Sequence, residues 1–421
     1  MTISITAKHM SVLIRAKDLK DAIKTLGITK NDDTIPLDTY IKITQENGHI
    51  NLSRQTLDYY INVRLPIANS NEKSGETPIN ATVDKKKLER LINRIDNEMI
   101  IGIENGSINK NELIISGDDK TKIFTYYISS IEGYAINNNI KSSDYQVYFE
   151  TRGDYLLEWL DMVSFAVSTK DTIGSQIAGI HINVDNNSLC LEATDTTVLS
   201  RIVIEDIENY LSNLNGIGST IVPVEIVRSV ENMCRIIGTS KIKIFYNTTE
   251  VVFENDSTII RAKSIKQPYP DTDRIIKTHN VYKFVTFGII ECIEAICRLI
   301  TVVNNDSPKV KIRFSDNLMY IEIRSSTYDY GIEVIDIINN GISEDLSIVI
   351  DARKLLMILK SIKDEGGAVD MGIESVSNTI IFTPANENTY NHRVIVIPAC
   401  KRLATFGTQQ TNYRDFIGIL I

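Results

Sequence analysis

The residue types that most often do chemistry are all present in this chain, but their spacing forms no known catalytic set. The five histidines show no metal-ligand spacing, and the five cysteines include no C-x-x-C pair. A Walker loop and the motifs G-x-G-x-x-G, H-E-x-x-H and G-x-S-x-G are likewise missing. We therefore expect no catalytic residue, no metal site and no cofactor, and we expect the cysteines to be reduced and buried.

One acidic residue stands out because of its setting. Asp195 lies in Glu192-Ala-Thr-Asp-Thr-Thr, where a predicted strand runs into a loop. An Asx turn is its expected role, since a short carboxylate readily accepts backbone N–H groups just ahead of it. The other acidic residues are dispersed, so no pair can be assigned as acid and base. A metal-dependent hydrolase, which needs a cleft of acidic groups, stays open as one alternative.

Length and composition indicate a folded protein of several domains. The chain has 421 residues, 43% of them hydrophobic, and a formal net charge of −9. At roughly 100–200 residues per domain, this length predicts two to four domains. The longest apolar stretch, 289–303, is broken by Glu291, Glu294 and Arg298, so a membrane span is not expected. The N-terminus lacks a secretory pattern, and we expect a cytoplasmic, nucleoid-associated protein.

The elements that could position functional residues recur three times. A strand runs into an amphipathic helix at 79–95, at 219–237 and at 346–363. Aligned on Val83 and its two counterparts Val222 and Val349, the copies lie 139 and 127 residues apart. Such offsets are too long for solenoid units of about 20–50 residues, so the repeat has the size of a domain.

Each copy also has an earlier helix, expected at 18–26, 153–167 and 287–303, with alternating strands between the two helices. The fold class is therefore α+β, with three repeated domains of two helices backed by antiparallel sheets. We expect domains at 1–143 (with a short N-terminal extension), 144–278 and 279–401, followed by a C-terminal extension at 402–421.

Basic residues lie on the polar faces of these helices although the chain as a whole is acidic. Lys86, Arg90 and Arg94, for example, are spaced at i, i+4 and i+8. This pattern indicates either a segregated positive surface or an ordinary solvated helix face. Nearby glutamates such as Glu89 and Glu231 weaken the first interpretation, and the pattern by itself leaves both open.

Several stretches, taken in order, resemble the bacterial sliding clamp, the beta subunit of the replicative DNA polymerase III. The stretches are 165–180, 191–201, Val222-Pro223, 262–276 and 394–399. The resemblance covers roughly residues 11–401 and is that of a divergent member. Thr196-Thr197-Val198 stands where the family has Gly-His-Arg, and Thr272 replaces the usual Tyr. Residues 402–421 lie beyond the family pattern, and an added strand is expected there.

The resemblance implies a ring-shaped processivity factor, formed by a head-to-tail homodimer of six domains. Twelve helices packed about 9 Å apart would enclose a bore of roughly 25 Å, enough for duplex DNA. Basic residues lining the bore would attract phosphates without reading bases. The candidates for DNA binding are Lys20, Lys24, Lys86, Arg90, Lys170, Arg228, Arg235, Arg298, Arg353 and Lys360.

The family's second site is a hydrophobic pocket that takes short peptides, typically a Gln with apolar residues. The resemblance implies that its users are the replicative polymerase, the clamp loader and other proteins with a clamp-binding motif; no membrane partner is expected. Carried over by position, the pocket residues are Ile177, Thr194, Leu199, Pro270, Arg274, Ile275, Ile395, Ile397, Pro398 and Ala399. A non-catalytic three-domain protein-binding scaffold that does not encircle DNA remains the alternative function.

Overall fold

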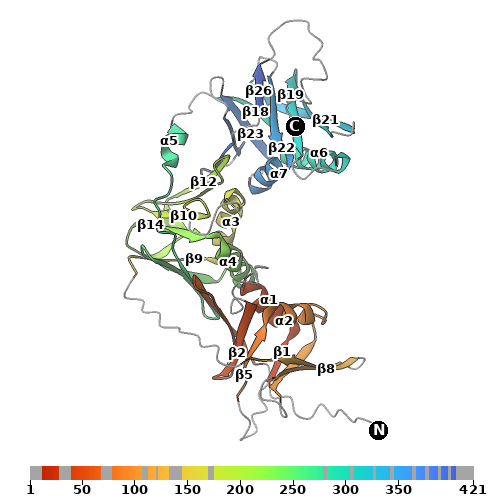
Figure 1. Cartoon of the computed structure of the whole chain (residues 1–421). Coiled ribbons are helices and arrows are strands. Elements are labelled where there is room, and N and C mark those ends of the chain that lie inside the picture. The colour runs from red at the N-terminus through yellow and green to blue at the C-terminus, as the bar shows by residue number, and fades with distance from the viewer. Residues whose placement is uncertain are drawn as a thin grey trace. The chain divides into compact units, whose positions relative to one another are not determined.

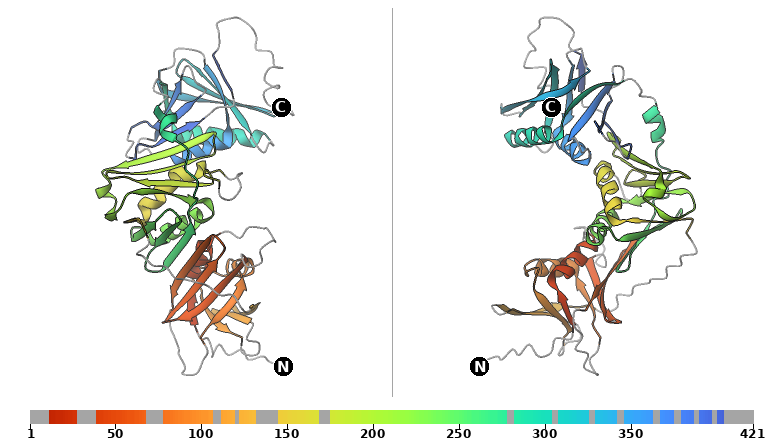
Figure 2. Two further views of the ribbon diagram at one scale, coloured as in Figure 1. Left: turned by 60° about the vertical axis from the view of Figure 1, so that its left-hand side comes forward. Right: turned by 180° about the vertical axis from the view of Figure 1, so that it is seen from behind.

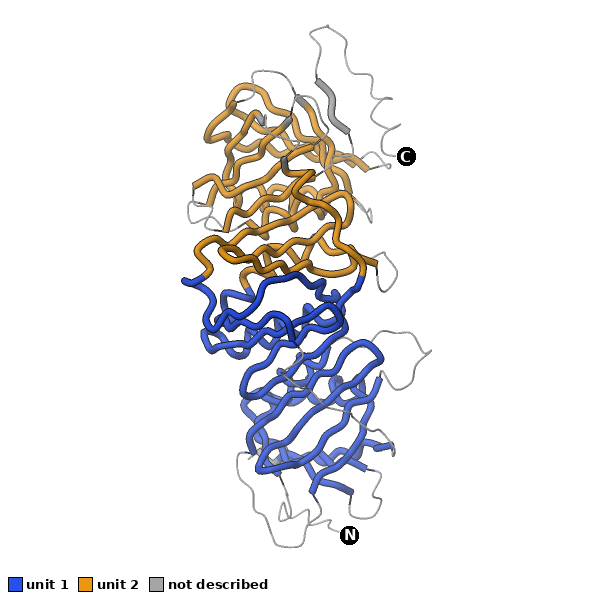
Figure 3. The backbone as a smooth tube through the Cα atoms, turned by 90° about the vertical axis from the view of Figure 1, so that its left-hand side faces the viewer, with its two compact units in different colours: residues 1–157, 208–266 blue, residues 158–207, 267–421 orange. Residues whose placement is uncertain are grey.

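The protein is described from a computed structural model. It covers residues 12–27, 39–67, 78–106, 112–119, 122–131, 145–168, 175–277, 282–303, 308–325, 329–341, 346–362, 367–374, 379–386, 390–396 and 400–403. The chain forms two compact units, residues 1–157 with 208–266 and residues 158–207 with 267–421 (Figure 3). Each unit is described by itself below.

In unit 1, the helices α1, α2 and α4 lie against antiparallel sheets (Figure 1). The first sheet has the order β1-β6-β7-β8, from Val12–Arg15, Ile100–Asn105, Glu112–Asp119 and Lys122–Ser129. The second has the order β13-β9-β15-β16-β17-β4-β3-β2-β5. Its strands are Ser212–Asn215, Val147–Arg152, Lys241–Tyr246, Glu250–Glu254, Thr258–Lys263, Tyr59–Pro66, His49–Gln55, Tyr40–Glu46 and Asn80–Asp84. The helices are α1 (Ala16–Thr25), α2 (Lys85–Ile92) and α4 (Val224–Ile237), the last preceded by β14 (Gly218–Pro223).

In unit 2, helices α6 (Ile289–Val302) and α7 (Ala352–Ser361) lie side by side against a long antiparallel sheet (Figure 2). The strands follow the order β10-β11-β12-β25-β24-β23-β18-β21-β20-β19-β22-β26. They span Gly179–Val184, Ser188–Thr194, Val198–Glu205, Arg393–Val396, Ile380–Pro384, Ala368–Glu374, Tyr282–Gly288, Tyr330–Asn340, Leu318–Arg324, Lys309–Ser315, Leu346–Asp351 and Cys400–Leu403. Helix α3 (Gly153–Val163) continues into the 3-10 turn η3 (Ser164–Ala166), and the short α5 (Thr272–Lys277) precedes β18.

The threefold α+β repeat expected from the sequence is confirmed. The strand-to-helix units are β5–α2, β14–α4 and β22–α7, and the earlier helices are α1, α3 and α6. Each helix buries one apolar face, as Leu19, Ala22 and Ile23 of α1 illustrate. Burying such a leucine or isoleucine side chain stabilises the fold by about 1.5–3 kcal/mol. The short α5, which periodicity did not predict, has only six residues.

Within each unit, the sheet continues from one repeat into the next. Strand β4 pairs antiparallel with β17, so that Tyr60 lies opposite Arg261. In unit 2, β12 pairs in the same way with β25, and Leu199 lies opposite Ile395. These two strand pairs, here called the strand joints, satisfy main-chain groups that would otherwise form an exposed sheet edge.

The expectation of buried cysteines is confirmed for three of the four cysteines whose side chains the structure describes and is wrong for Cys297. Cys190, Cys234 and Cys292 are buried, whereas Cys297 is exposed, and burial raises the pKa of the Cys190 thiol to about 12. Among the described residues, no helix is long and apolar enough to span a membrane. No group of three or more His, Cys, Asp or Glu side chains suited to a metal ion occurs in that same part of the chain.

Strand β26 extends the sheet beside β22, with Cys400 opposite Val349. The part of the C-terminal extension after Leu403 lies outside the described residues. The expectation of an added strand at 402–421 therefore stays a prediction for most of that segment.

Two aspartates cap the helices that follow them, and they yield the first testable prediction. Asp84 accepts a hydrogen bond from the backbone N–H of Lys87, and Asp351 accepts from Arg353 and Lys354. We expect Asp84→Ala or Asp351→Ala to lower the free energy of unfolding by about 1 kcal/mol, because a helix N–H loses its partner. Replacement by Ser should retain most of that stability, and Lys87→Ala serves as the exposed control. Urea denaturation checks this, and equal midpoints for the Ala and Ser variants would contradict it.

Candidate nucleic-acid interface and peptide pocket

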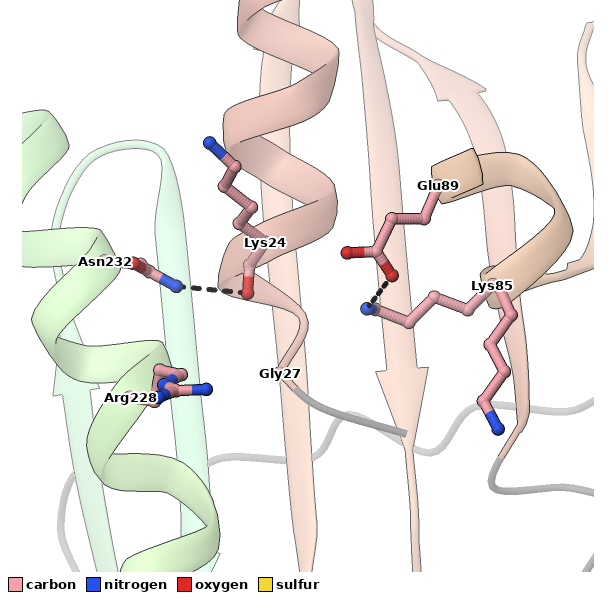
Figure 4. Close-up of a pocket in the computed structure, with 7 residues that line it drawn as sticks. Lys24, Gly27, Lys85, Glu89, Arg228 and Asn232 are labelled. Atoms are coloured by element: carbon pink, nitrogen blue, oxygen red, sulfur yellow. Dashed lines mark hydrogen bonds and ion pairs between the residues drawn. The ribbon is translucent and has the colours of Figure 1, made fainter. Parts of the chain in front are cut away.

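Three of the predicted DNA-binding residues line one pocket in unit 1. Lys24 comes from the end of α1 and Arg228 from α4 (Figure 4). Lys86 comes from the start of α2. The pocket has a volume of about 340 Å³. Its remaining lining residues are Gly27, Lys85, Glu89 and Asn232. Four cationic side chains and one carboxylate therefore surround a single cavity, which suits a phosphate group.

The pocket exists because the end of α1 packs against α4. Asn232 donates from its side-chain amide to the carbonyl oxygen of Lys24 over 3.2 Å. The buried Arg54 donates to the carbonyl of Leu26, the C-cap residue, over 2.8 Å. Gly27 then leaves the helix with a φ of +81°, a left-handed conformation that glycine adopts without strain. These contacts fix the position of Lys24 relative to Arg228.

Lys85, which sequence reasoning did not select, is a buried cation that lines the same pocket. Its side chain is only 3% exposed, and its ammonium lies 3.2 Å from a carboxylate oxygen of Glu89. Burial lowers the pKa of Lys85, and Glu89 partly offsets that effect. Figure 4 shows the two side chains pointing toward each other beside Lys24. The helix pattern could not reveal this residue, because at the first position of α2 it lies on the buried face.

Two other candidates of unit 1 lie on helix surfaces, and a third is engaged within its own repeat. Arg90 is exposed on α2. Arg235 is exposed on α4, with Glu231 at 3.7 Å and the amide oxygen of Asn232 at 3.3 Å. Lys20 donates to the carbonyl of Ile95 over 2.5 Å and to the side chain of Asn97 over 2.7 Å. Its ammonium therefore ties α1 to the chain just after α2.

The candidates of unit 2 differ in how much of their charge is already compensated. Arg353 and Lys360 are exposed on α7. Arg298 on α6 has Glu333 at 2.9 Å and Glu294 at 3.7 Å, which leaves little net positive charge there. Lys170 lies outside the described residues.

Two of the predicted peptide-pocket residues form part of the strand joint of unit 2. Leu199 of β12 and Ile395 of β25 are direct cross-strand partners, each 4% exposed. Ile381 joins them in one apolar cluster, and Ile276 of α5 packs against it. Thr194 closes the turn before Leu199 by donating its hydroxyl to the carbonyl of Val198 over 2.7 Å.

The other predicted pocket residues that the structure describes lie on two segments of unit 2. Arg274 and Ile275 are exposed on α5, and Pro270 is half-buried just before that helix. Ile177 is half-buried, and its carbonyl accepts a hydrogen bond from the backbone N–H of Ser168. Ile397, Pro398 and Ala399 lie outside the described residues.

The turn that departs from the family sequence is held by an ion pair. Asp195 accepts the backbone N–H groups of Thr197 and Val198 over 2.9 and 2.8 Å, which confirms the expected Asx turn. Lys354, on the first turn of α7, lies 2.6 Å from the other carboxylate oxygen. Burial alone would raise the pKa of Asp195, but the hydrogen bonds from Lys354 and Thr197 hold that pKa below its usual value.

Comparison with known proteins points in one direction. No protein-family model matches the chain. The beta sliding clamp of Rickettsia felis is 22% identical over 379 residues, which are 87% of this chain and 94% of that protein. Among solved structures, the DNA polymerase III beta subunit of Thermotoga maritima matches with a TM-score of 0.74 and 17% identity, over 93% of this chain and 99% of that one. The Pseudomonas aeruginosa DnaN clamp, bound to griselimycin, gives a TM-score of 0.72 and 15% identity, over 92% and 98% of the two chains.

The fold is that of the bacterial sliding clamps. The resemblance read from the sequence motifs is thus confirmed, and the chain is similar to these clamps over almost its whole length. Low identity is consistent with the departures at Thr196-Thr197-Val198 and at Thr272.

The packing at the end of α1 provides a second testable prediction. A Cβ added at Gly27 would lie 3.0 Å from the Ser229 hydroxyl, in addition to the strain of its positive φ. Gly48 has a similar φ of +74° but no atom within 4 Å of such a Cβ. We expect Gly48→Ala to cost roughly 1–2 kcal/mol of unfolding free energy and Gly27→Ala to cost clearly more. Equal losses of unfolding free energy for the two variants in urea denaturation would contradict this, because the contact between α1 and α4 would then accept the added methyl group without further cost.

Proposed function

We propose that the protein is a sliding clamp, a non-catalytic processivity factor whose ring encircles duplex DNA and tethers a DNA polymerase. The observation that carries this proposal is a pair of exposed strand edges that repeat the pattern of the two strand joints. The fold shared with the bacterial clamps supports it as well. A tethered polymerase stays at a high effective concentration near the primer end.

The strand joints follow one rule. The third strand after the first helix of one repeat (β4 or β12) pairs with another strand. Its partner is the third strand after the second helix of the next repeat (β17 or β25). By position, β21 corresponds to β4 and β12, and β8 corresponds to β17 and β25. Among the described residues, β8 pairs on one side only, and residues 330–334 of β21 pair with β20 alone. The β21 edge of one copy can therefore pair with the β8 edge of a second copy.

Both edges expose apolar side chains, which such a contact would cover. On β8, Ile123 is 63% and Tyr127 is 66% exposed. On β21, Tyr330, Ile332 and Val334 are 45%, 43% and 49% exposed. Long apolar strand edges invite pairing with another chain, so the second copy supplies a physical reason for them. Two such contacts per dimer are heterologous yet close on themselves, as in a ring.

The registers of the joints predict which residues meet. When the hairpin β20–β21 is aligned with β11–β12 by the residue pairings of their strands, Tyr330 takes the position of Leu199. Strands β6-β7-β8 can be aligned in the same way with β23-β24-β25, starting from the residues that precede α1 and α6. In this alignment Tyr127 takes the position of Ile395. Because Leu199 lies opposite Ile395, Tyr330 should lie opposite Tyr127 of the second copy, and Val334 opposite Ile123.

The helices support the same assembly. Within unit 1, α1 packs against α4, and within unit 2, η3 at the end of α3 contacts α7. A first helix thus meets the second helix of the following repeat, which leaves α6 to meet α2 of a second copy. Helix α6 exposes Glu291 and Glu294, whereas α2 exposes Lys87 and Arg90. Opposite charges on the two helices would favour the head-to-tail orientation.

The pocket around Lys24, Lys86 and Arg228 supports contact with the DNA backbone. Cationic side chains attract phosphates whatever the base sequence, which allows a ring to slide. At the strand joint of unit 2, the apolar cluster around Leu199 supports binding of short peptides. The polymerase, the clamp loader and other proteins with a clamp-binding motif are the partners that we propose for this site.

Cross-linking tests the ring. In a Cys297→Ser background, we expect Tyr127→Cys combined with Tyr330→Cys to give a covalent dimer, detected by non-reducing gel electrophoresis. The matched control is Tyr127→Cys with Val334→Cys, which moves one thiol roughly 13 Å along the strand and should cross-link poorly. A cross-linked dimer on circular DNA should also resist high salt. Equal cross-linking in both pairs, or none, would favour the scaffold that does not encircle DNA.

Charge reversal tests the DNA contact. We expect the triple variant Lys24→Glu, Lys86→Glu and Arg228→Glu to weaken binding to a fluorescent duplex. The slope of log affinity against log salt concentration should show about two to three fewer counterions released on binding. The control triple, Arg64→Glu, Lys243→Glu and Lys266→Glu, changes the net charge equally at exposed positions outside the helices. Fluorescence anisotropy across a salt series provides the measurement. Equal losses in the two triples would mean that only overall charge matters.

A further inference from the structure

A row of polar residues crosses three neighbouring strands of unit 2 beside the peptide pocket. The strand registers make His181 of β10 a direct neighbour of Glu192 of β11, and Glu192 a direct neighbour of Arg201 of β12. The Nδ1 atom of His181 lies 2.8 Å from Glu192 Oε1, and Arg201 Nε lies 3.9 Å from Oε2. Glu192 is only 4% exposed. A carboxylate this deeply buried needs partners, since leaving it without them is costly.

The start of α5 supplies those partners. Thr272, which is 4% exposed, donates its hydroxyl to Glu192 Oε2 over 2.5 Å. Arg201 donates from Nη1 to Asp273 Oδ1 over 2.5 Å and to the Thr272 hydroxyl over 3.3 Å. Just before the helix, the Tyr269 ring stacks on the His181 ring at 4.7 Å, with 13° between their planes. Three side chains of the segment 269–273 are thus fixed to one row on the sheet.

These contacts matter because α5 cannot hold its own position. A helix of six residues is too short to be stable without tertiary contacts. Its apolar contact is through Ile276, which packs on the cluster of Leu199, Ile381 and Ile395. The polar row binds the first turn of α5, and Ile276 binds the last. Between these two attachments lie Arg274 and Ile275, the exposed residues assigned to the peptide pocket.

We propose that Glu192 is a positioning residue for peptide binding, acting through Thr272 and Arg201 to hold α5 with Arg274 and Ile275 beside the Leu199–Ile395 strand joint. The inference rests on the proposed peptide-binding function of that joint. Glu192 itself touches no peptide. It sets the location of a pocket wall, and hydrogen bonds to its charged carboxylate are stronger than those between neutral groups. Thr272, which replaces the family's usual Tyr, is the residue through which this chain makes the connection.

A pair of substitutions at Thr272 tests the proposal. Thr272→Val removes the hydroxyl at nearly constant shape, and Thr272→Ser keeps it. The probe is a fluorescent synthetic peptide with one Gln and two or three apolar residues, followed by anisotropy. We expect Thr272→Val to bind the peptide about tenfold more weakly than the parent protein, and Thr272→Ser to bind within about twofold of it. Hydrogen exchange of amides 272–277 should rise in the Val variant and stay unchanged in the Ser variant.

A matched control separates positioning from general stability. Thr220 is a buried threonine of unit 1, and its hydroxyl bonds to that of Ser264 over 2.7 Å. Thr220→Val should lower the melting temperature as Thr272→Val does, yet leave peptide affinity unchanged. Equal affinity of the Val and Ser variants at position 272 would overturn the positioning role. Failure of the parent protein to bind the peptide would instead reject the proposed function of the joint.

Discussion

The constraint on which this structure depends is that the edge of a β-sheet must find a partner. Each repeat is a helix pair on antiparallel strands, and each ends in strands whose main-chain groups face outward. Pairing β4 with β17 and β12 with β25 satisfies these groups inside the chain. In the proposed ring, the same rule pairs β8 with β21 of a second copy. The architecture and the proposed assembly would then share one physical cause, which is the satisfaction of backbone hydrogen bonds.

Charge is distributed in a way that suits a ring around DNA. The chain is acidic overall, with a net charge of −9, yet cationic side chains from three helices meet at one pocket. Lys85 is buried there, a position that a lysine rarely occupies without a partner, and Glu89 supplies that partner. In the proposed ring, the remaining cationic groups near it would attract phosphates, while acidic residues elsewhere would discourage nonspecific association.

The proposed peptide site combines an apolar cluster, which is part of the strand joint, with a short helix that needs external support. Leu199 and Ile395 face each other because the strands pair in one register. Helix α5 is bonded through the Thr272 hydroxyl to the buried Glu192. The turn at Asp195, where the family motif is lost, is instead anchored by Lys354. A divergent sequence can therefore keep the fold while changing the polar groups that orient its sites.

The sequence by itself determined the threefold repeat and the places of its paired helices, and it supplied the capping residues Asp84 and Asp351, because these features depend on periodicity and on bonds between near neighbours. It also indicated the cationic helix faces. Only the tertiary structure decided which of those cations meet, since it brings Lys24 to Arg228 but engages Lys20 with Ile95, 75 residues away. Likewise, no local pattern links Glu192 to Thr272, 80 residues on. Periodicity shows which face of an element is buried, but the partner across that face depends on strand register and helix packing, which involve distant parts of the chain.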